Sequence, residues 1–226
     1  MENVESVYAL SPMQADILLR ALRQPGLHEY VELVTWTLRG PFDPAAFAAA
    51  WGHVAARHSV LRTSFFHEGL EHPVQAVRRR VEVPVEAEDW RGVPAAEREE
   101  RFRRLLRGAR ERDFDLGAAP LLRVRAVREG DEAYRFAWTY HHLLLDGWSA
   151  IACVREVLEA YAALAAGGAP ARAPAAPYAD SVAWLARQDG AEAERFWRGA
   201  LEGVEPPAPL PLDGAREADG TAYRVE

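Results

Sequence analysis

The sequence predicts an α/β fold, an α+β two-layer sandwich in which helices pack on a mixed sheet. Three observations support it. Segments with strand-like alternation and segments with helical spacing follow one another along the chain. No repeat period is visible. The 226 residues are 49% hydrophobic, enough for one core, or for one domain with part of a second.

The first third of the chain predicts two helices around a strand. Ser11 is placed to cap a helix over residues 12–23, with Pro12 at its first position, and Pro25-Gly26 ends it. Residues 32–38 have strand composition. Asp43-Pro44 opens a second helix, which we expect to run to Arg57.

The middle of the chain predicts strands, a charged helix and a hairpin. We expect strands over residues 61–66, 74–77 and 81–85, a helix over 95–112, and a hairpin of 121–127 and 134–140 around Gly130-Asp131. The Gly/Pro/Ala-rich run from Gly167 to Pro177 is predicted to be a linker.

Charge and cysteine content limit the classes of function. A net charge of −7 argues against broad binding of nucleic acid, which needs a surplus of Lys and Arg. The single Cys153 excludes an internal disulfide and suits a reducing compartment. No secretory leader or 18-residue apolar run is present. We therefore expect a cytoplasmic protein with no membrane partner.

The most informative stretch carries two adjacent histidines, His141 and His142, followed by Asp146-Gly147. It lies between a predicted strand that ends at Tyr140 and a predicted helix over residues 149–166. Side chains at such a turn are presented to a ligand by a rigid scaffold.

Three interpretations of this stretch are open. One imidazole can act as a general base or hold an incoming amine or hydroxyl, with the aspartate orienting it. His141, His142 and Asp146 could instead hold a metal ion, although no cysteine helps them. The third interpretation is structural: a partly buried histidine pair, with Asp146 capping the following helix.

The stretch from His141 to Gly147 resembles the HHxxxDG signature of condensation domains of nonribosomal peptide synthetases, relatives of chloramphenicol acetyltransferase. Other segments are similar to motifs of that family in the same order. They are residues 10–14 (LSPMQ), 57–65 (RHSVLRTSF), 113–116 (DFDL) with 120–123 (PLLR), and the aromatic residues Tyr178, Trp184, Phe196 and Trp197. The similarity runs from about Tyr8 to Leu212.

The resemblance implies a chloramphenicol acetyltransferase-like lobe. A complete condensation domain has two similar lobes and roughly twice this length, so we expect the N-terminal lobe over residues 1–168, a linker over 169–177, and the start of the second lobe over 178–226. Because the catalytic cleft lies between the lobes, the 226 residues alone are expected to be inactive.

The resemblance also implies the chemistry and the site. An acyl or peptidyl thioester on an upstream peptidyl carrier protein would react with the amine of an aminoacyl thioester on a downstream one. His142 would position the amine or take its proton, and the Gly147 amide would stabilise the oxyanion. His141 is expected to pack, Arg62 to pair with Asp146, and Trp148 and Ser149 to begin a helix facing the cleft. No metal or cofactor is implied, because the phosphopantetheine belongs to the carriers, and adjacent synthetase domains are the other expected partners.

The sequence leaves other functions open. The chain could be an inactive docking or scaffold module, or an acyltransferase that uses a free amine. Epimerisation is disfavoured by Trp148-Ser149, and heterocyclisation by the histidine pair. Seven arginines between Arg98 and Arg112 predict a salt-bridged surface helix, with docking of an acidic carrier as the alternative.

Overall fold

The computed structural model describes residues 3–24, 26–171 and 175–205. The chain divides into two compact units, Met1–Arg187 and Gln188–Glu226. Within the described part, the first unit holds two sheets and five helices, and the second holds helix α6 (Gly190–Ala200). The fold is therefore α/β, as the sequence predicts.

The larger sheet forms the platform for the signature. Its strands are β2 (Val31–Arg39), β7 (Ala133–His141), β6 (Leu122–Gly130) and β5 (Val85–Asp89), in that spatial order. β2, β7 and β6 are antiparallel, while β5 lies parallel to β6, so the sheet is mixed. The predicted hairpin of β6 and β7 is confirmed.

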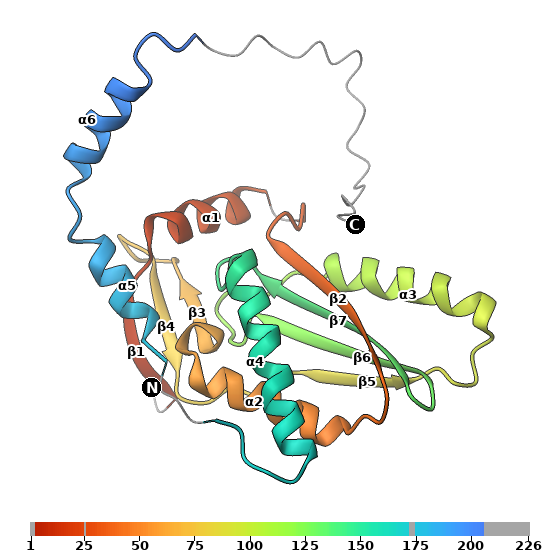
Figure 1. The fold of residues 1–226 in the computed structure, drawn as a ribbon. Coiled ribbons are helices and arrows are strands. Elements are labelled where there is room, and N and C mark those ends of the chain that lie inside the picture. The colour runs from red at the N-terminus through yellow and green to blue at the C-terminus, as the bar shows by residue number, and fades with distance from the viewer. Residues whose placement is uncertain (1–2, 25, 172–174, 206–226) are drawn as a thin grey trace, which may run out of the picture. The chain divides into compact units, whose positions relative to one another are not determined.

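Helices cover both faces of this sheet (Figure 1). On one face lie α2 (Pro44–Arg57) and α4 (Gly147–Ala165), packed against each other. Alternate β7 residues, among them Phe136 and Trp138, join the main core under these helices. On the other face α3 (Ala95–Arg110) forms a smaller core, in which Phe102 meets Trp90 and Val127.

The second sheet has three strands, in the order β1 (Val4–Ala9), β4 (Val74–Arg78) and β3 (Thr63–Phe66). Strand β1 was not expected, because its side chains are mostly exposed and give little alternation. Residues 61 and 62 belong to a 3₁₀ turn (Ser59–Arg62) rather than to the expected strand. The strand predicted over residues 81–85 is also wrong except for Val85, where β5 begins.

The N-terminal helices begin where their caps predict. α1 (Pro12–Arg23) has a capping box, in which the Gln14 amide donates to Ser11 Oγ and Gln14 Oε1 accepts from the Ser11 amide. In α2, Asp43 Oδ1 accepts from the amides of Ala45 and Ala46.

Compact packing continues beyond the predicted linker. Helix α5 (Tyr178–Leu185) belongs to the first unit; Val182 is buried, and Tyr178 Oη lies 3.5 Å from Ser11 Oγ. Residues 172–174 of the expected linker, and residues 206–226 of the expected second lobe, lie outside the described residues. The lobe boundaries stay predictions.

The charged helix α3 is partly covered by ion pairs. Around the middle of the helix, Arg103 forms ion pairs with Glu99 and Glu100, as expected. Four exposed arginines towards the C-terminal end of the helix, or just after it, have no ion pair with any residue that the structure describes: Arg104, Arg107, Arg110 and Arg112. The salt-bridged surface that the sequence predicts is thus confirmed around the middle of the helix, over residues 99–103.

Candidate active site between β7 and α4

The signature forms the connection between the end of β7 and the start of α4. The His142 amide donates to the Tyr30 carbonyl at 2.8 Å, which extends the pairing of β7 with β2 by one residue. Side chains alternate along such a ladder, so the rings of His141 and His142 leave the chain on opposite sides. The connection therefore separates two residues that are adjacent in sequence.

His142 has a ring orientation suited to accepting a proton. Its Nδ1 lies 2.7 Å from the Leu145 carbonyl oxygen. A carbonyl only accepts hydrogen bonds, so Nδ1 is the nitrogen that carries the hydrogen. In the neutral ring Nε2 is then the free acceptor, and no described residue bonds to it. The half-buried ring thus offers a lone pair.

His141 has the opposite arrangement. It is 5% exposed, and its Nδ1 accepts a hydrogen bond from the Leu143 amide at 3.1 Å, so the hydrogen of the neutral ring is on Nε2. The rings of Tyr30 and Phe114 lie 6.3 and 6.4 Å away. Burial lowers the pKa of His141 to about 4, so the ring is neutral at ordinary pH.

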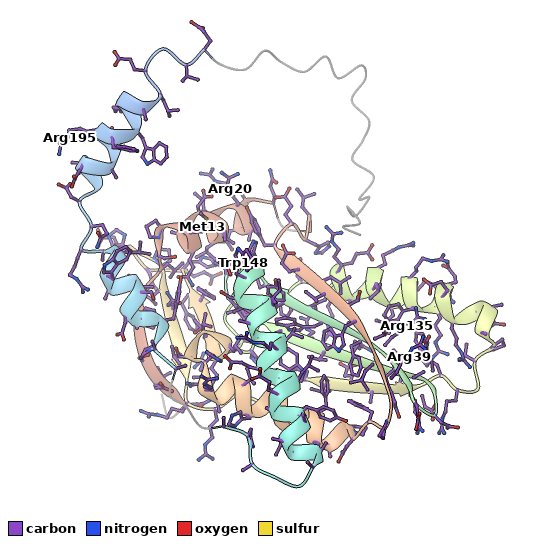
Figure 2. The ribbon with its side chains drawn as sticks, viewed as in Figure 1. Met13, Arg20, Arg39, Arg135, Trp148 and Arg195 are labelled. Carbon is purple, nitrogen blue, oxygen red and sulfur yellow. The ribbon has the colours of Figure 1, made fainter. Side chains whose placement is uncertain are left out.

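Asp146 caps helix α4. Its Oδ1 accepts from the Ser149 amide at 2.8 Å, and hydrogen bonding to Ser149 lowers the pKa of the carboxyl group. The helix begins at Gly147, and the amides of Gly147 and Trp148 bond to no described residue. Figure 2 shows Trp148 at this end of α4, where it is 85% exposed.

The expected pair of Asp146 with Arg62 is wrong. Arg62 is buried and donates from Nε to the Ala55 carbonyl and from Nη1 to Glu5 Oε2 at 2.6 Å and to the Arg78 carbonyl. The pairing required the segment that carries Arg62 to lie in one sheet with β7, whereas it leads into β3 of the other sheet. Asp146 uses its carboxylate as a cap instead.

Gln14 is a residue of the site that the sequence did not reveal. Its Nε2 donates to the Leu143 carbonyl at 3.1 Å, and its Oε1 accepts from Gln75 Nε2 at 2.9 Å. Gln75 in turn donates to the Ala9 carbonyl at 3.0 Å, and both glutamines are buried. The available signal was the position of Gln14 in the LSPMQ segment, which also gives the capping box of α1.

No metal site is formed by the signature. His141, His142 and Asp146 do not make up a metal-binding group, nor do any three His, Cys, Asp or Glu side chains in residues 3–24, 26–171 and 175–205. Cys153 lies in the core of the first unit, and burial raises the pKa of its thiol to about 12. No described helix combines the length and apolarity needed to span a bilayer.

Comparison with known protein families identifies the family of this chain. The family model of the condensation domain matches residues 4–224. The chain belongs to the condensation domain family. Curated proteins similar to this condensation domain include a linear gramicidin synthase polypeptide of Brevibacillus parabrevis, 40% identical over 93% of the chain, and surfactin synthase subunit 2 of Bacillus subtilis (strain 168), 31% identical over 93%.

Solved structures show the same fold. The starter condensation domain of rhizomide synthetase RzmA superposes on 90% of the chain with a TM-score of 0.77 at 22% identity, which shows the fold. The X-domain from teicoplanin biosynthesis, solved in complex with OxyB, has a TM-score of 0.74 at 27% identity. The chain spans 50% and 47% of these two structures, and 3% and 6% of the gramicidin and surfactin synthase polypeptides.

Proposed function

We propose that this condensation domain takes part in forming an amide bond between two carrier-bound substrates. The acyl or peptidyl thioester is held on an upstream peptidyl carrier protein, and the aminoacyl thioester on a downstream one, each through the carrier's phosphopantetheine. The synthetases that the chain resembles support this substrate class. Adjacent synthetase domains are the other proposed partners. We also propose a cytoplasmic location, because the buried, free Cys153 suits a reducing compartment.

The hydrogen bond between His142 Nδ1 and the Leu145 carbonyl is the observation that carries the proposal. With Nδ1–H held by the Leu145 carbonyl, Nε2 is the acceptor. The amine nitrogen attacks the thioester carbonyl carbon, the C–N bond forms and the C–S bond breaks. His142 Nε2 holds the amine and takes the proton that it loses, which then passes to the departing thiolate.

The start of α4 supplies the second part of the site. The free amides of Gly147 and Trp148 point out of the first turn of the helix, whose N-terminus carries partial positive charge. The Gly147 amide stabilises the negative charge that develops on the thioester oxygen. Asp146 acts indirectly, because its bond to the Ser149 amide fixes where the helix starts.

His142→Asn tests this proposal more sharply than truncation of the side chain to alanine. The asparagine Nδ2 takes the place of Nδ1 and keeps the bond to the Leu145 carbonyl, but nothing replaces Nε2. In a two-lobed protein that has this chain as its first lobe, we expect ~10²–10⁴-fold slower amide formation between loaded carriers, since that is the usual contribution of such a group. His142→Ala should lose as much activity and some stability.

The control variant changes the neighbouring histidine, His141. His141→Asn keeps an acceptor for the Leu143 amide and should retain most of the turnover. Wild-type rates of amide formation in His142→Asn would refute the catalytic assignment. Rapid acylation of a free amine with no downstream carrier would favour the carrier-independent acyltransferase instead.

A further inference from the structure

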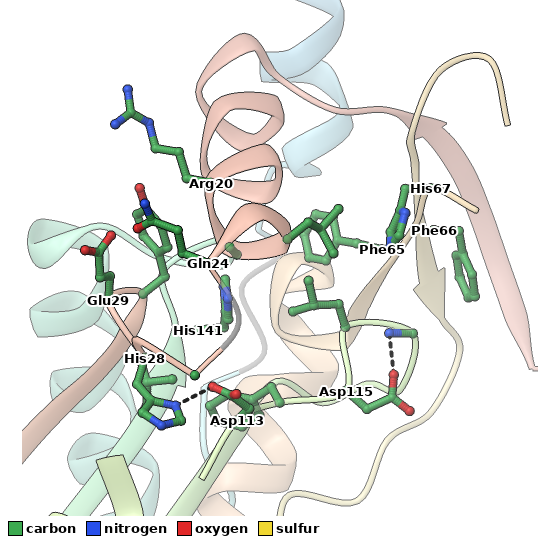
Figure 3. A pocket seen from close by; sticks show the side chains of 18 of the residues that line it. Arg20, Gln24, His28, Glu29, Phe65, Phe66, His67, Asp113, Asp115 and His141 are labelled. Carbon is green, nitrogen blue, oxygen red and sulfur yellow. Dashed lines mark hydrogen bonds and ion pairs between the residues drawn. The ribbon is translucent and has the colours of Figure 1, made fainter. Parts of the chain in front are cut away.

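A cavity of about 640 Å³ lies on the His141 side of the signature, and none of the chemistry above uses it. It opens between the end of α1, the segment that leads into β2, the end of β3 and the loop around Phe114 (Figure 3). Phe65, Phe114, Leu116 and Tyr30 give it apolar walls. The volume is in the range of pockets that hold small molecules.

His141 brings to this cavity a hydrogen-bond donor without a partner among the described residues. His141 is only 5% exposed, and its Nδ1 is occupied by the Leu143 amide. Its Nε2–H therefore remains as a donor, and no described residue accepts from it. The fully buried side-chain atoms without partners, among described residues, belong to Tyr8, Trp36, Trp51, Arg135 and Trp138, so His141 Nε2 is not sealed off.

The edge of the cavity is acidic. Four carboxylates line it and form what we call the acidic rim: Glu29, Glu68, Asp113 and Asp115. Arg20 also lines the cavity, but its guanidinium is bonded to Asp16 at 2.9 Å. An anionic ligand would meet like charge at this edge, whereas a neutral or cationic one would not.

Two of the rim carboxylates, Asp113 and Asp115, are held by hydrogen bonds. His28 Nδ1 lies 2.6 Å from Asp113 Oδ1, and His28 has a φ of 53°, a conformation that costs energy for a residue with a side chain. Asp115 Oδ1 accepts from the Gly117 amide at 3.0 Å. The loop that forms one wall is thus tied to the segment that forms another.

We propose that this cavity binds a neutral or cationic, carbonyl-containing ligand with an apolar substituent. The carbonyl oxygen accepts the Nε2–H of His141, the apolar part lies against Phe65 and Phe114, and a positive charge, where present, faces the acidic rim. The binding requires no turnover, so it can be tested apart from amide formation. It gives His141 a role in ligand binding in addition to packing.

The experiment is a titration of the 226-residue chain, labelled with ¹⁵N in its histidine rings, with three probes followed by NMR. L-phenylalanine amide is cationic, N-acetyl-L-phenylalanine amide is neutral, and N-acetyl-L-phenylalanine is anionic. We expect the first two to shift the His141 Nε2–H resonance with saturation. The anionic probe should bind about tenfold more weakly or worse, because of like-charge repulsion.

A matched pair of variants isolates the donor. His141→Asn keeps the acceptor for the Leu143 amide and removes Nε2–H, so the neutral amide should bind about three- to tenfold more weakly, as expected for one lost hydrogen bond. In this variant, which lacks the His141 ring signal, the affinity is measured from the chemical shifts of the backbone amides in the cavity walls. His72→Asn changes a histidine whose side chain is 85% exposed, and should leave the affinity unchanged.

Each other outcome overturns part of the proposal. No shift at His141 with any probe at millimolar concentration would remove the site. Equal affinity of wild type and His141→Asn would remove the donor from it. Equal binding of the anionic and neutral probes would refute the role of the acidic rim.

Discussion

The two sides of the strand end at His141 and His142 differ in almost every physical respect. On the His142 side, a half-buried ring leaves Nε2 as a free acceptor beside the start of α4. On the His141 side, a buried ring is neutral and leaves Nε2 as a donor towards a cavity with an acidic rim. One strand thus gives a proton acceptor on one face and a donor on the other.

The difference arises from backbone bonds and not from the residue type. His142 Nδ1 meets a carbonyl, that of Leu145, whereas His141 Nδ1 meets an amide, that of Leu143. The two bonds therefore select opposite tautomers, with the hydrogen on Nδ1 in His142 and on Nε2 in His141. The path of the turn from Leu143 to Leu145 therefore decides the chemistry of both rings, and what holds that path matters for both.

The strongest way to disturb both sides together is Gln14→Leu. This change removes the donor to the Leu143 carbonyl and leaves Gln75 without its buried partner. We expect a loss of roughly 2–4 kcal/mol in the free energy of unfolding, since each unsatisfied buried polar group costs ~1–3 kcal/mol. Chemical denaturation measures it.

A control variant on the same helix makes the Gln14 result specific. Met13→Ala, at an exposed neighbour on the same helix, should cost far less. If Gln14→Leu left both the stability and the NMR signals of the two histidine rings unchanged, the glutamine pair would not be what holds the turn.

The buried, neutral state of His141 should appear in the pH dependence of stability. Its pKa is about 4 in the folded protein and 6.5 in the unfolded chain, so the unfolded chain binds the proton first as the pH falls. The stabilisation is complete above about pH 6.5 and is lost as the pH falls towards 4, by on the order of 3 kcal/mol.

Comparing His141→Asn with wild type isolates this contribution from that of the carboxylates. The difference in unfolding free energy between the two proteins should change across pH 6.5 to 4, with the variant losing less stability. A constant difference over that interval would show that His141 is protonated as easily in the folded state as in the unfolded one.

A smaller effect is expected at Asp146. As a helix cap it should contribute about 1 kcal/mol, so Asp146→Ala should lower the free energy of unfolding by that amount, and Asp146→Asn by less. A buried ion pair broken on one side would cost ~3–5 kcal/mol. A loss in that larger range for Asp146→Ala would contradict the capping role and restore an ionic partner.

Much of this could be predicted from the sequence, and the failures have physical causes. Caps such as Ser11 and Asp43 located the helices, because the signal is local. The pairing of Arg62 failed because strand order cannot be read from local pattern: the segment joins a different sheet from β7. The Gln14 contact joins atoms 129 positions apart, from Gln14 to Leu143, and no spacing encodes it. The two tautomers depend on short-range bonds, from His142 to Leu145 and from Leu143 to His141, but these bonds form only in a turn whose backbone path no residue pattern specifies.

The most direct test of the contrast between the two sides is a long-range ¹H–¹⁵N NMR spectrum of the histidine rings, recorded over a range of pH. We predict that His142 carries its hydrogen on Nδ1 and His141 on Nε2, and that His141 stays neutral until the pH approaches about 4. Two rings with the same tautomer, or a His141 that titrates near 6.5, would contradict the opposite roles assigned to these neighbours.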